Sequence, residues 1–328
     1  MTKTIKWGIL SSAKIAENSM VPAIHSASNS ELHAVASASG KAAETAASWK
    51  AETSYDSYEA LLQDETIDAV YIPLPNALHK EWAIKAMHHG KHVLLEKPAA
   101  VTSEDIQEIR EAGKETGMTW MEAFMYQFHP QHAFVKEQIS QNVIGDVRRI
   151  RASFSFNLDL DSSNIRLDPE LGGGSLYDVG CYCVHVSRFL LDAEPTHVFS
   201  DGRYKDGVDI SSTALLTFDE ADAVLDCSFQ ESPLNRYEVV GTKGRIEVPF
   251  AFRPDQNPND GLGEVFVKGE DGAVTKHETF AADQFTLQIE HFSQCLLDGT
   301  APSYTPESTH NNMKVIEALY TSQQQSSM

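Results

Sequence analysis

The chain is poor in the features that mark disulfide-rich and metal-binding proteins. It has four cysteines in 328 residues. Cys181 and Cys183 form a C-x-C pair instead of the C-x-x-C spacing of zinc and redox sites, and no second pair accompanies them. No H-x-x-x-H pair lies within one predicted helix, where the spacing would bring both histidines to the same face and support a metal. We therefore expect no metal site, and buried thiols in a reducing compartment.

Long apolar runs and positive charge are also scarce. No apolar run approaches the ~20 residues of a membrane span, and residues 1–6 lead into a predicted strand without a signal-peptide pattern. The 26 basic residues face 47 acidic ones, for a formal net charge of −21. Nucleic-acid binding requires a basic face. We expect a cytoplasmic protein with neither a membrane nor a nucleic acid as partner.

The first part of the chain alternates between short apolar strands and helical segments. Expected strands span residues 5–10, 32–37, 67–72, 93–95 and 119–122. Expected helices span residues 13–26, 41–49, 58–63, 77–89 and 103–115, the last with Ser103 as N-cap. This alternation predicts an α/β domain with a doubly wound parallel sheet.

The pattern changes near Gly145 to strands separated by turn residues. These strands are expected at residues 149–156, 197–200, 214–218, 223–229, 237–240, 246–250 and 264–267. Helices are expected at 184–191, 284–297 and 308–322, and the polar tail 323–328 is expected to fray. The pattern predicts a mostly antiparallel sheet. We expect a first domain over 1–123 and an α+β domain over 124–328, with the last helix packing back on the first domain.

The stretch Val93 to Pro98 is the most informative in the chain, since an apolar strand runs directly into Glu96-Lys97-Pro98. A lysine there lies at the carboxyl end of a strand, where open α/β sheets bind their ligands. Its ammonium group can exchange a proton with a substrate hydroxyl. The alternative is an ordinary surface lysine in a strand-to-helix loop.

The turn after the first strand is a weak match to a dinucleotide site. A pyrophosphate would lie on the helix N-terminus near residues 9–15, but Ser11, Ala13 and Ala16 occupy the positions of the glycine fingerprint. Taken alone, this favours an α/β domain without a nucleotide, although the serine hydroxyls can donate to phosphate. The candidate contacts are Ser11, Ser12, Ala13, Lys14 and Ile15.

The end of the second strand distinguishes the two nucleotides. An NAD site has an acidic residue there, whereas an NADP site has donors and positive charge for the 2′-phosphate. The segment carries Ser37, Ser39 and Lys41, and no carboxylate precedes Glu44. This predicts NADP as the preferred cofactor, with NAD as the alternative. A polar strand-to-helix loop without a ligand is the other interpretation.

Several motifs in order resemble the glucose–fructose oxidoreductase/inositol dehydrogenase (Gfo/Idh/MocA) family over nearly the whole chain. They are WGIL (7–10), EKP (96–98), EAFMY (122–126), GGGSLYDVGCY (172–182) and NMKVI (312–316). Tyr182 and the stretch 124–126 are most similar to dihydrodiol dehydrogenase, NADP-linked xylose dehydrogenase and glucose–fructose oxidoreductase. The resemblance implies an N-terminal Rossmann domain and a C-terminal domain with a large open sheet. It also implies a homodimer or homotetramer formed through that sheet.

The resemblance further implies hydride transfer between a pyridine nucleotide and a sugar, polyol or diol. Lys97 would be catalytic together with Asp178 and Tyr182, and Glu96 would bind the cofactor and position the lysine. Further residues implied for the cofactor are Leu74, Asn76, His79 and Arg166. Those implied for the substrate are Lys97, Tyr126, Arg166, Asp178, Tyr182 and His185. The Lys97–Pro98 bond would be cis.

The family pattern is not matched at two positions. Many members carry a histidine where this chain has Tyr182, and an aspartate where it has His185. Apart from the resemblance, Tyr182 can also be a core aromatic, because Leu176, Val179 and Val184 are its apolar neighbours. A keto-sugar reductase and a non-catalytic nucleotide-binding regulator are the alternative functions. Retention of Lys97, Asp178 and Tyr182 together disfavours the regulator.

Overall fold

The computed structural model describes residues 3–326, which form two compact units. The first unit comprises residues up to 125 together with residues 283–310. The second comprises residues 126–282 and those from 311 onward. Residues 283–310 thus group with the first unit although they follow the second sheet in sequence. The assignment of cofactor binding to residues 1–123 and of substrate binding to residues 124–328 stays a prediction.

The first unit contains a six-stranded parallel sheet with strand order β3-β2-β1-β4-β5-β6. The strands are β1 (Ile5–Leu10), β2 (Ser30–Ala36), β3 (Thr53–Tyr55), β4 (Ala69–Ile72), β5 (His92–Leu95) and β6 (Trp120–Glu122). Strands β4 and β6 are buried throughout, as parallel strands covered by helices on both faces require. The predicted doubly wound sheet is confirmed.

Helices of the first unit connect these strands and cover the sheet. They are α1 (Val21–Ser26), α2 (Ala42–Trp49), α3 (Tyr58–Leu62), α4 (His79–His88), α5 (Ser103–Thr116) and α8 (Gln284–Asp298). A π-helical turn, Ala16–Met20, precedes α1. Helix α8 contacts α1 and β1, and there the indole N–H of Trp7 donates to the Ser293 hydroxyl at 3.2 Å. The segment 283–310 therefore completes the core of this unit.

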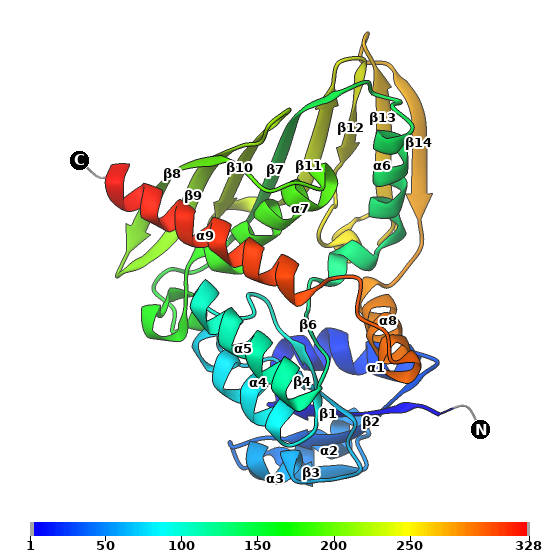
Figure 1. The fold of residues 1–328 in the computed structure, drawn as a ribbon, viewed down its shortest axis with the longest axis vertical. Helices are drawn as coiled ribbons and strands as arrows, with labels where there is room; N and C mark the ends of the chain where they lie inside the picture. The colour runs from blue at the N-terminus through cyan, green and yellow to red at the C-terminus, as the bar shows by residue number, and fades with distance from the viewer. Residues whose placement is uncertain (1–2, 327–328) are drawn as a thin grey trace. The chain divides into compact units, whose positions relative to one another are not determined.

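The second unit is built on an eight-stranded sheet with order β14-β13-β12-β11-β7-β10-β9-β8, which Figure 1 shows from β8 to β14. Its strands are β7 (Val147–Asn157), β8 (His197–Lys205), β9 (Val208–Thr217), β10 (Asp222–Ser228), β11 (Gln230–Gly241), β12 (Gly244–Val248), β13 (Gly263–Gly269) and β14 (Val274–Phe280). Neighbouring strands are antiparallel except β7 and β10. The predicted mostly antiparallel sheet is confirmed.

Two helices lie against one face of this sheet (Figure 1). Helix α6 (Pro130–Ser140) contacts β13 and β14, and α7 (Cys181–Leu191) contacts β7 and β10. Helix α9 (Pro306–Ser326) begins in the first unit, where Glu307 pairs with Arg110. Its later residues bond within the second unit. The other face of the sheet carries no helix of the described second unit.

Some local expectations were wrong. Thr102, not Ser103, caps α5, because its hydroxyl accepts from the N–H of Asp105 at 3.1 Å. Residue 323 does not belong to a frayed tail: the Gln323 side chain is buried and donates to the Ser200 and Ser212 hydroxyls. Residues 327–328 of that tail lie outside the described residues. Elements β3, α6 and β14 were not predicted.

Candidate functional site

The turn after β1 has an unusual backbone at Ser11. Its φ is 112°, in a region that favours glycine and that serine adopts only at an energetic cost. The hydroxyl of Ser11 donates to the carbonyl of Pro73 at 3.3 Å and accepts from the N–H of Ala13 at 3.3 Å. The backbone at Ser11 therefore adopts the conformation typical of a glycine in the fingerprint, although the residue there is serine.

Three predicted cofactor residues lie together at the carboxyl ends of β1 and β2. The hydroxyl of Ser37 lies 3.4 Å from that of Ser12 and 2.8 Å from that of Ser39. Lys41 is exposed and directly precedes α2. This edge of a parallel sheet is where open α/β domains bind ligands. Of the remaining predicted contacts in the first turn, Lys14 is exposed, and Ala13 and Ile15 are partly exposed.

Lys97 lies at the same edge, directly after β5, and is partly exposed. The Lys97–Pro98 bond is cis, as the resemblance implied. A carboxylate oxygen of Glu96 accepts from the backbone N–H of Lys97 at 3.1 Å, and the other accepts from the Tyr71 hydroxyl. Glu96 is thus held by two donors beside the lysine, in agreement with a positioning role.

His79, a predicted cofactor residue, is fully buried beneath this corner. Its Nδ1 lies 2.8 Å from the carbonyl of Pro98, and its Nε2 lies 2.8 Å from the carbonyl of Leu74. Burial lowers the pKa of His79 to about 4, so the ring is neutral and donates to only one of these carbonyls at a time. His79 therefore links the backbone at Leu74 to the backbone at Pro98, and its role toward the cofactor stays a prediction. Leu74 is buried, and Asn76 is partly exposed at the start of a 3-10 turn.

Glu122 is a buried acidic residue behind Lys97 that sequence reasoning noted only as part of a motif. It ends β6, and its carboxylate accepts from the N–H of Ala99 at 2.8 Å and from the Tyr304 hydroxyl at 3.1 Å. Burial raises the pKa of Glu122 to about 7. The carboxyl group fixes the backbone immediately after Pro98. In the sequence, the only sign that Glu122 has such a role was its position as a carboxylate at the end of an apolar strand.

In the second unit, Tyr182 lies in the first turn of α7 among aromatic rings. Its ring centroid is 5.3 Å from Phe154, 5.4 Å from Phe252 and 5.8 Å from Tyr126, and the residue is 4% exposed. These contacts fix the ring plane while leaving a small part of the residue accessible. The core-aromatic interpretation and a catalytic role are therefore compatible at this position.

Asp178 lies one turn before Tyr182, in a π-helical turn, Leu176–Gly180. Its carboxylate accepts from Nε of Arg166 at 2.6 Å. Single π-helical turns are common at functional sites. The side chain of Arg166 is partly exposed. The ion pair therefore places a positive and a negative charge close in sequence to Tyr182.

Tyr126 and His185, both predicted substrate residues, are buried. The Tyr126 hydroxyl lies 2.5 Å from Nδ1 of His185, and burial lowers the pKa of His185 well below its usual value. The neutral His185 ring thus holds the Tyr126 phenol, which packs against the ring of Tyr182. The assignment of Tyr126 and His185 to the substrate stays a prediction.

A buried aspartate that was not predicted holds the segment before Asp178. Asp209 accepts from the Ser175 hydroxyl at 2.6 Å, the N–H of Leu176 at 2.8 Å and the Tyr320 hydroxyl at 2.7 Å. Gly174 has a φ of 133°, and a Cβ there would lie 2.3 Å from Oδ1 of Asp209. The third glycine of the GGG stretch is therefore required by both space and backbone conformation.

Comparison with known proteins identifies the family. Residues 5–124 match the model of the oxidoreductase family with an NAD-binding Rossmann fold, and residues 132–247 match the GFO/IDH/MocA C-terminal domain. The chain belongs to the Gfo/Idh/MocA family. It is thus an oxidoreductase with a dinucleotide-binding domain, and the predicted fold class and family are confirmed.

Relatives in the Gfo/Idh/MocA family include two named dehydrogenases. The NADP-dependent D-xylose 1-dehydrogenase 2 of Haloferax volcanii is 35% identical over 96% of each chain. The trans-1,2-dihydrobenzene-1,2-diol dehydrogenase of Xenopus tropicalis is 31% identical over 91% of each chain. A 3-ketoreductase from Actinomadura kijaniata, solved with NADP and TDP-benzene, has a TM-score of 0.89 and 31% identity over 98% of each chain. The predicted branch of the family is confirmed.

Two further expectations concern the chain as a whole. None of the four cysteines, all of which lie in the described part of the chain, forms a disulfide, and all four are buried. Within residues 3–326, no helix combines the length and the apolar character needed to cross a bilayer.

Proposed function

We propose that the chain transfers a hydride between NADP and a secondary alcohol or ketone of a sugar, polyol or diol. The observation that carries the proposal is the family match over both units. The two dehydrogenase relatives act on a sugar and a diol by their names. Oxidation of a secondary alcohol releases a hydride and a proton, and a bound nicotinamide would accept the hydride.

The proton is the part of this reaction that the chain's own residues must handle. We propose that the Tyr182 hydroxyl exchanges the substrate proton and that the Lys97 ammonium stabilises the resulting phenolate. The aromatic contacts of Tyr182 support this role, because they fix the direction of its hydroxyl. The Arg166–Asp178 pair, with its short 2.6 Å contact, would bind substrate hydroxyls as both donor and acceptor.

The preference for NADP rests on the end of β2. The hydroxyls of Ser12, Ser37 and Ser39 form a continuous polar group, and Lys41 precedes α2 without a neighbouring carboxylate in sequence before Glu44. Donors and positive charge suit a 2′-phosphate. The NADP-dependent relatives support the same choice, and NAD remains the alternative cofactor.

The reductive direction is the second candidate function. The similar solved structure is of a 3-ketoreductase, and the same proton-handling residues serve both directions. A keto-sugar would then be the substrate and the Tyr182 hydroxyl the proton donor. The proposed location of the protein is the cytoplasm.

The proposal is tested by following nicotinamide absorbance with a panel of aldoses, inositols, cyclic diols and keto-sugars, in both directions and with both cofactors. Wild type should turn over at least one of them, and Tyr182→Phe should lose about 10²–10⁴ in kcat while its Tm is retained. Tight NADPH binding without any turnover would favour a regulatory protein. A collapse of the Tm with full activity per folded molecule would make Tyr182 a core residue only.

We also propose that the open face of the eight-stranded sheet pairs with a second copy of the chain, as a dimer or within a tetramer. Apolar residues adjoin across neighbouring strands there: Phe199 pairs with Leu215, which pairs with the partly exposed Val224. Phe199 is 56% exposed and Leu215 39% exposed. Exposed apolar patches of this kind are typical of interaction surfaces.

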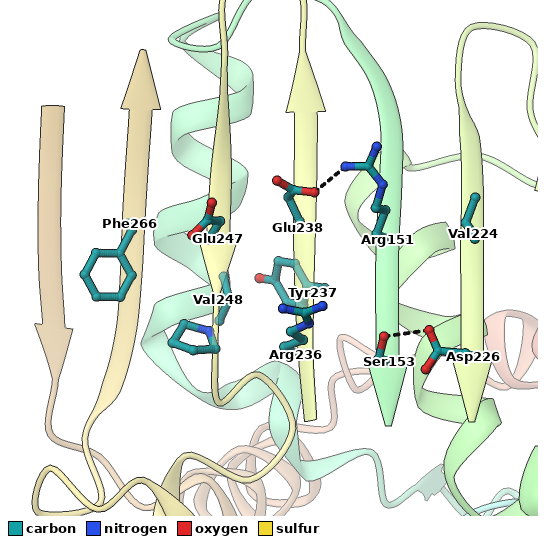
Figure 2. A pocket seen from close by; sticks show the side chains of 11 residues that line it. Arg151, Ser153, Val224, Asp226, Arg236, Tyr237, Glu238, Glu247, Val248 and Phe266 are labelled. Carbon is teal, nitrogen blue, oxygen red and sulfur yellow. Dashed lines mark hydrogen bonds and ion pairs between the residues drawn. The ribbon is translucent and has the colours of Figure 1, made fainter. Parts of the chain in front are cut away.

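Next to these residues, the same face is hollowed. A pocket of about 340 Å³ lies there, and Figure 2 shows its lining side chains on β7, β10, β11, β12 and β13. Arg151 pairs with Glu238, and the Ser153 hydroxyl donates to Asp226 at 2.7 Å. The charges of Arg151 and Glu238 thus neutralise each other, and the Asp226 carboxylate has a donor. Both contacts support burial of this face against a partner.

A further inference from the structure

A histidine and two glutamates gather at the amino ends of β2 and β3. Glu31 and His33 are two residues apart on β2 and therefore point to the same face. The parallel register pairs Ala34 with Thr53, which brings Glu52 beside His33. One ligand atom from each of Glu31, His33 and Glu52 lies within 4.8 Å of the others. Cofactor binding is expected at the opposite, carboxyl edge of this sheet.

The tautomer of His33 follows from its hydrogen bonds. The Thr66 hydroxyl donates to Oδ1 of Asp64 at 2.7 Å, and a hydroxyl has only one hydrogen to give. The same hydroxyl lies 2.8 Å from Nε2 of His33, so it must accept there. Nε2 therefore carries a proton, and in the neutral ring Nδ1 is left with a lone pair.

This nitrogen belongs to a residue that is only 7% exposed. Nδ1 lies 3.0 Å from Oε2 of Glu52, close enough for an ion pair, yet it makes no hydrogen bond of acceptable geometry. The carboxylate oxygen thus lies off the direction in which an N–H at Nδ1 would point. A lone pair and a carboxylate oxygen at this distance repel each other unless a positive charge lies between them.

We propose that Glu31, His33 and Glu52 bind a divalent transition-metal ion such as Zn²⁺. An imidazole nitrogen and an oxygen 3.0 Å apart can both contact one ion at about 2.0–2.2 Å. Imidazole and carboxylate together suit Zn²⁺ and its neighbours in the first transition row. Thr66 and Asp64 orient the ring through Nε2, the arrangement that commonly supports a histidine ligand.

The surroundings of the cluster determine how tightly it would bind an ion and which strands the ion would join. Lys6 lies 3.5 Å from Oε1 of Glu31 and competes with the ion for that carboxylate. Strand β3 has three residues and lies at the edge of the sheet, where pairing is least supported. An ion held by Glu52 and His33 would tie the start of β3 to β2.

The test is calorimetric titration of chelator-treated protein with Zn²⁺, together with thermal unfolding. Wild type should bind one ion in this cluster and show a higher Tm with Zn²⁺. His33→Gln should lose this binding, and the exposed Glu52→Gln, which should fold normally, should weaken it at least tenfold. His25→Gln is the matched control: this histidine bonds to the Trp49 carbonyl at 2.8 Å, and its loss should leave Zn²⁺ binding unchanged.

Two results would overturn the proposal. Wild type that binds no Zn²⁺ would make His33 an imidazolium paired with Glu52. Equal binding by wild type, Glu52→Gln and His33→Gln would place the ion elsewhere. Thr66→Val adds a check on the tautomer: it should weaken binding by about tenfold or more, because the ring loses the group that orients it.

Discussion

Lys97 and Tyr182 differ in their surroundings. Lys97 follows a buried strand but is itself partly exposed, and its backbone N–H is held by Glu96 at 3.1 Å. Tyr182 is almost fully packed between aromatic rings. A partly exposed lysine and a closely packed phenol suit the proposed division of roles, in which the phenol sets the geometry and the lysine supplies charge.

Lys97→Met should abolish turnover while NADPH binding persists. The loss of a positioned acid–base group costs about 10²–10⁴ in rate, whereas the serine cluster at β2 that would bind the 2′-phosphate is untouched. Steady-state rates and NADPH fluorescence titration measure the two effects. Lys85→Met, an exposed lysine on α4, is the control and should behave as wild type. Near-native turnover of Lys97→Met would remove this lysine from the mechanism.

Lys41→Ala should weaken NADP selectively. A charge-assisted hydrogen bond to the 2′-phosphate contributes roughly 1.5–3 kcal/mol when well formed. Exposure and salt reduce this, so the expected loss is about tenfold, or about 1.4 kcal/mol. The measurement is kcat/KM for NADP and for NAD in wild type and variant. An equal loss for both cofactors, or a wild type that favours NAD, would defeat the assignment.

Glu122 should make stability fall as the pH rises from about 4.5 to about 7. Burial raises its pKa from 4.5 to about 7, so the folded protein binds the proton more tightly than the unfolded chain does. The stability from this group is complete below the unfolded pKa and is lost as the pH rises through the folded value. The full effect is on the order of 3 kcal/mol. Glu96 also faces this carboxyl and raises its pKa further.

Denaturant unfolding at pH 5 and pH 8 checks this prediction. Glu122→Gln should lose most of the difference between the two pH values, because it carries no titratable group. Glu111→Gln, at an exposed position on α5, is the control and should keep the wild-type difference. If Glu122→Gln keeps it as well, another group is responsible.

At the level of elements, the segment that precedes α7 depends on Gly174. Its φ of 133° and the close approach of Asp209 leave no room for a side chain, and Asp209 in turn holds Ser175 and Leu176. Asp178 is tied to this segment directly, because its N–H donates to the Gly174 carbonyl at 3.0 Å. Its position therefore depends on the buried network around Asp209.

Gly174→Ala should destabilise the protein by more than the backbone strain alone, which is about 1–3 kcal/mol, and should lower kcat. Gly207→Ala is the matched control, because Gly207 has a φ of 91° but its nearest neighbour to a Cβ is Pro169 at 3.7 Å. Thermal unfolding and steady-state kinetics measure both variants. Equal effects of the two substitutions would show that the contact with Asp209 does not matter.

The elements predicted from sequence are those with a strong apolar pattern. The buried strands β1, β4 and β5 were recognised because parallel strands are apolar on both faces. Strand β14 was missed because most of its residues are exposed and polar. Helix α6 was missed because it buries Gln131, His132 and Gln138, which disguise its apolar face.

The site divides in the same way. The assignments of Lys97, Asp178 and Tyr182 come from short motifs and from the resemblance, and their catalytic roles stay predictions. Asp209 and Tyr320 were not found, because their partners lie far away in sequence and no local pattern links them. Glu31, His33 and Glu52 likewise come together only through the register of β2 and β3.

At the scale of the whole molecule, the open face of the eight-stranded sheet should decide the oligomeric state. Light scattering coupled to size-exclusion chromatography should find a dimer or tetramer. Leu215→Glu should dissociate it, because a charge would be buried in the apolar part of the face. Val143→Glu, an exposed apolar residue in the turn after α6, is the control. A monomeric wild type, or an oligomer insensitive to Leu215→Glu, would remove this face as the interface.

The return of residues 283–310 to the first unit has a consequence for the order of events on the ribosome. A nascent chain stopped after residue 125 lacks α8, so Trp7 has neither Ser293 nor Phe292 to pack against. At about 5–20 residues per second, translation of the next 185 residues (310 − 125) takes roughly 10–40 s. The dinucleotide-binding unit therefore waits, with an incomplete core, while the whole second sheet is synthesised.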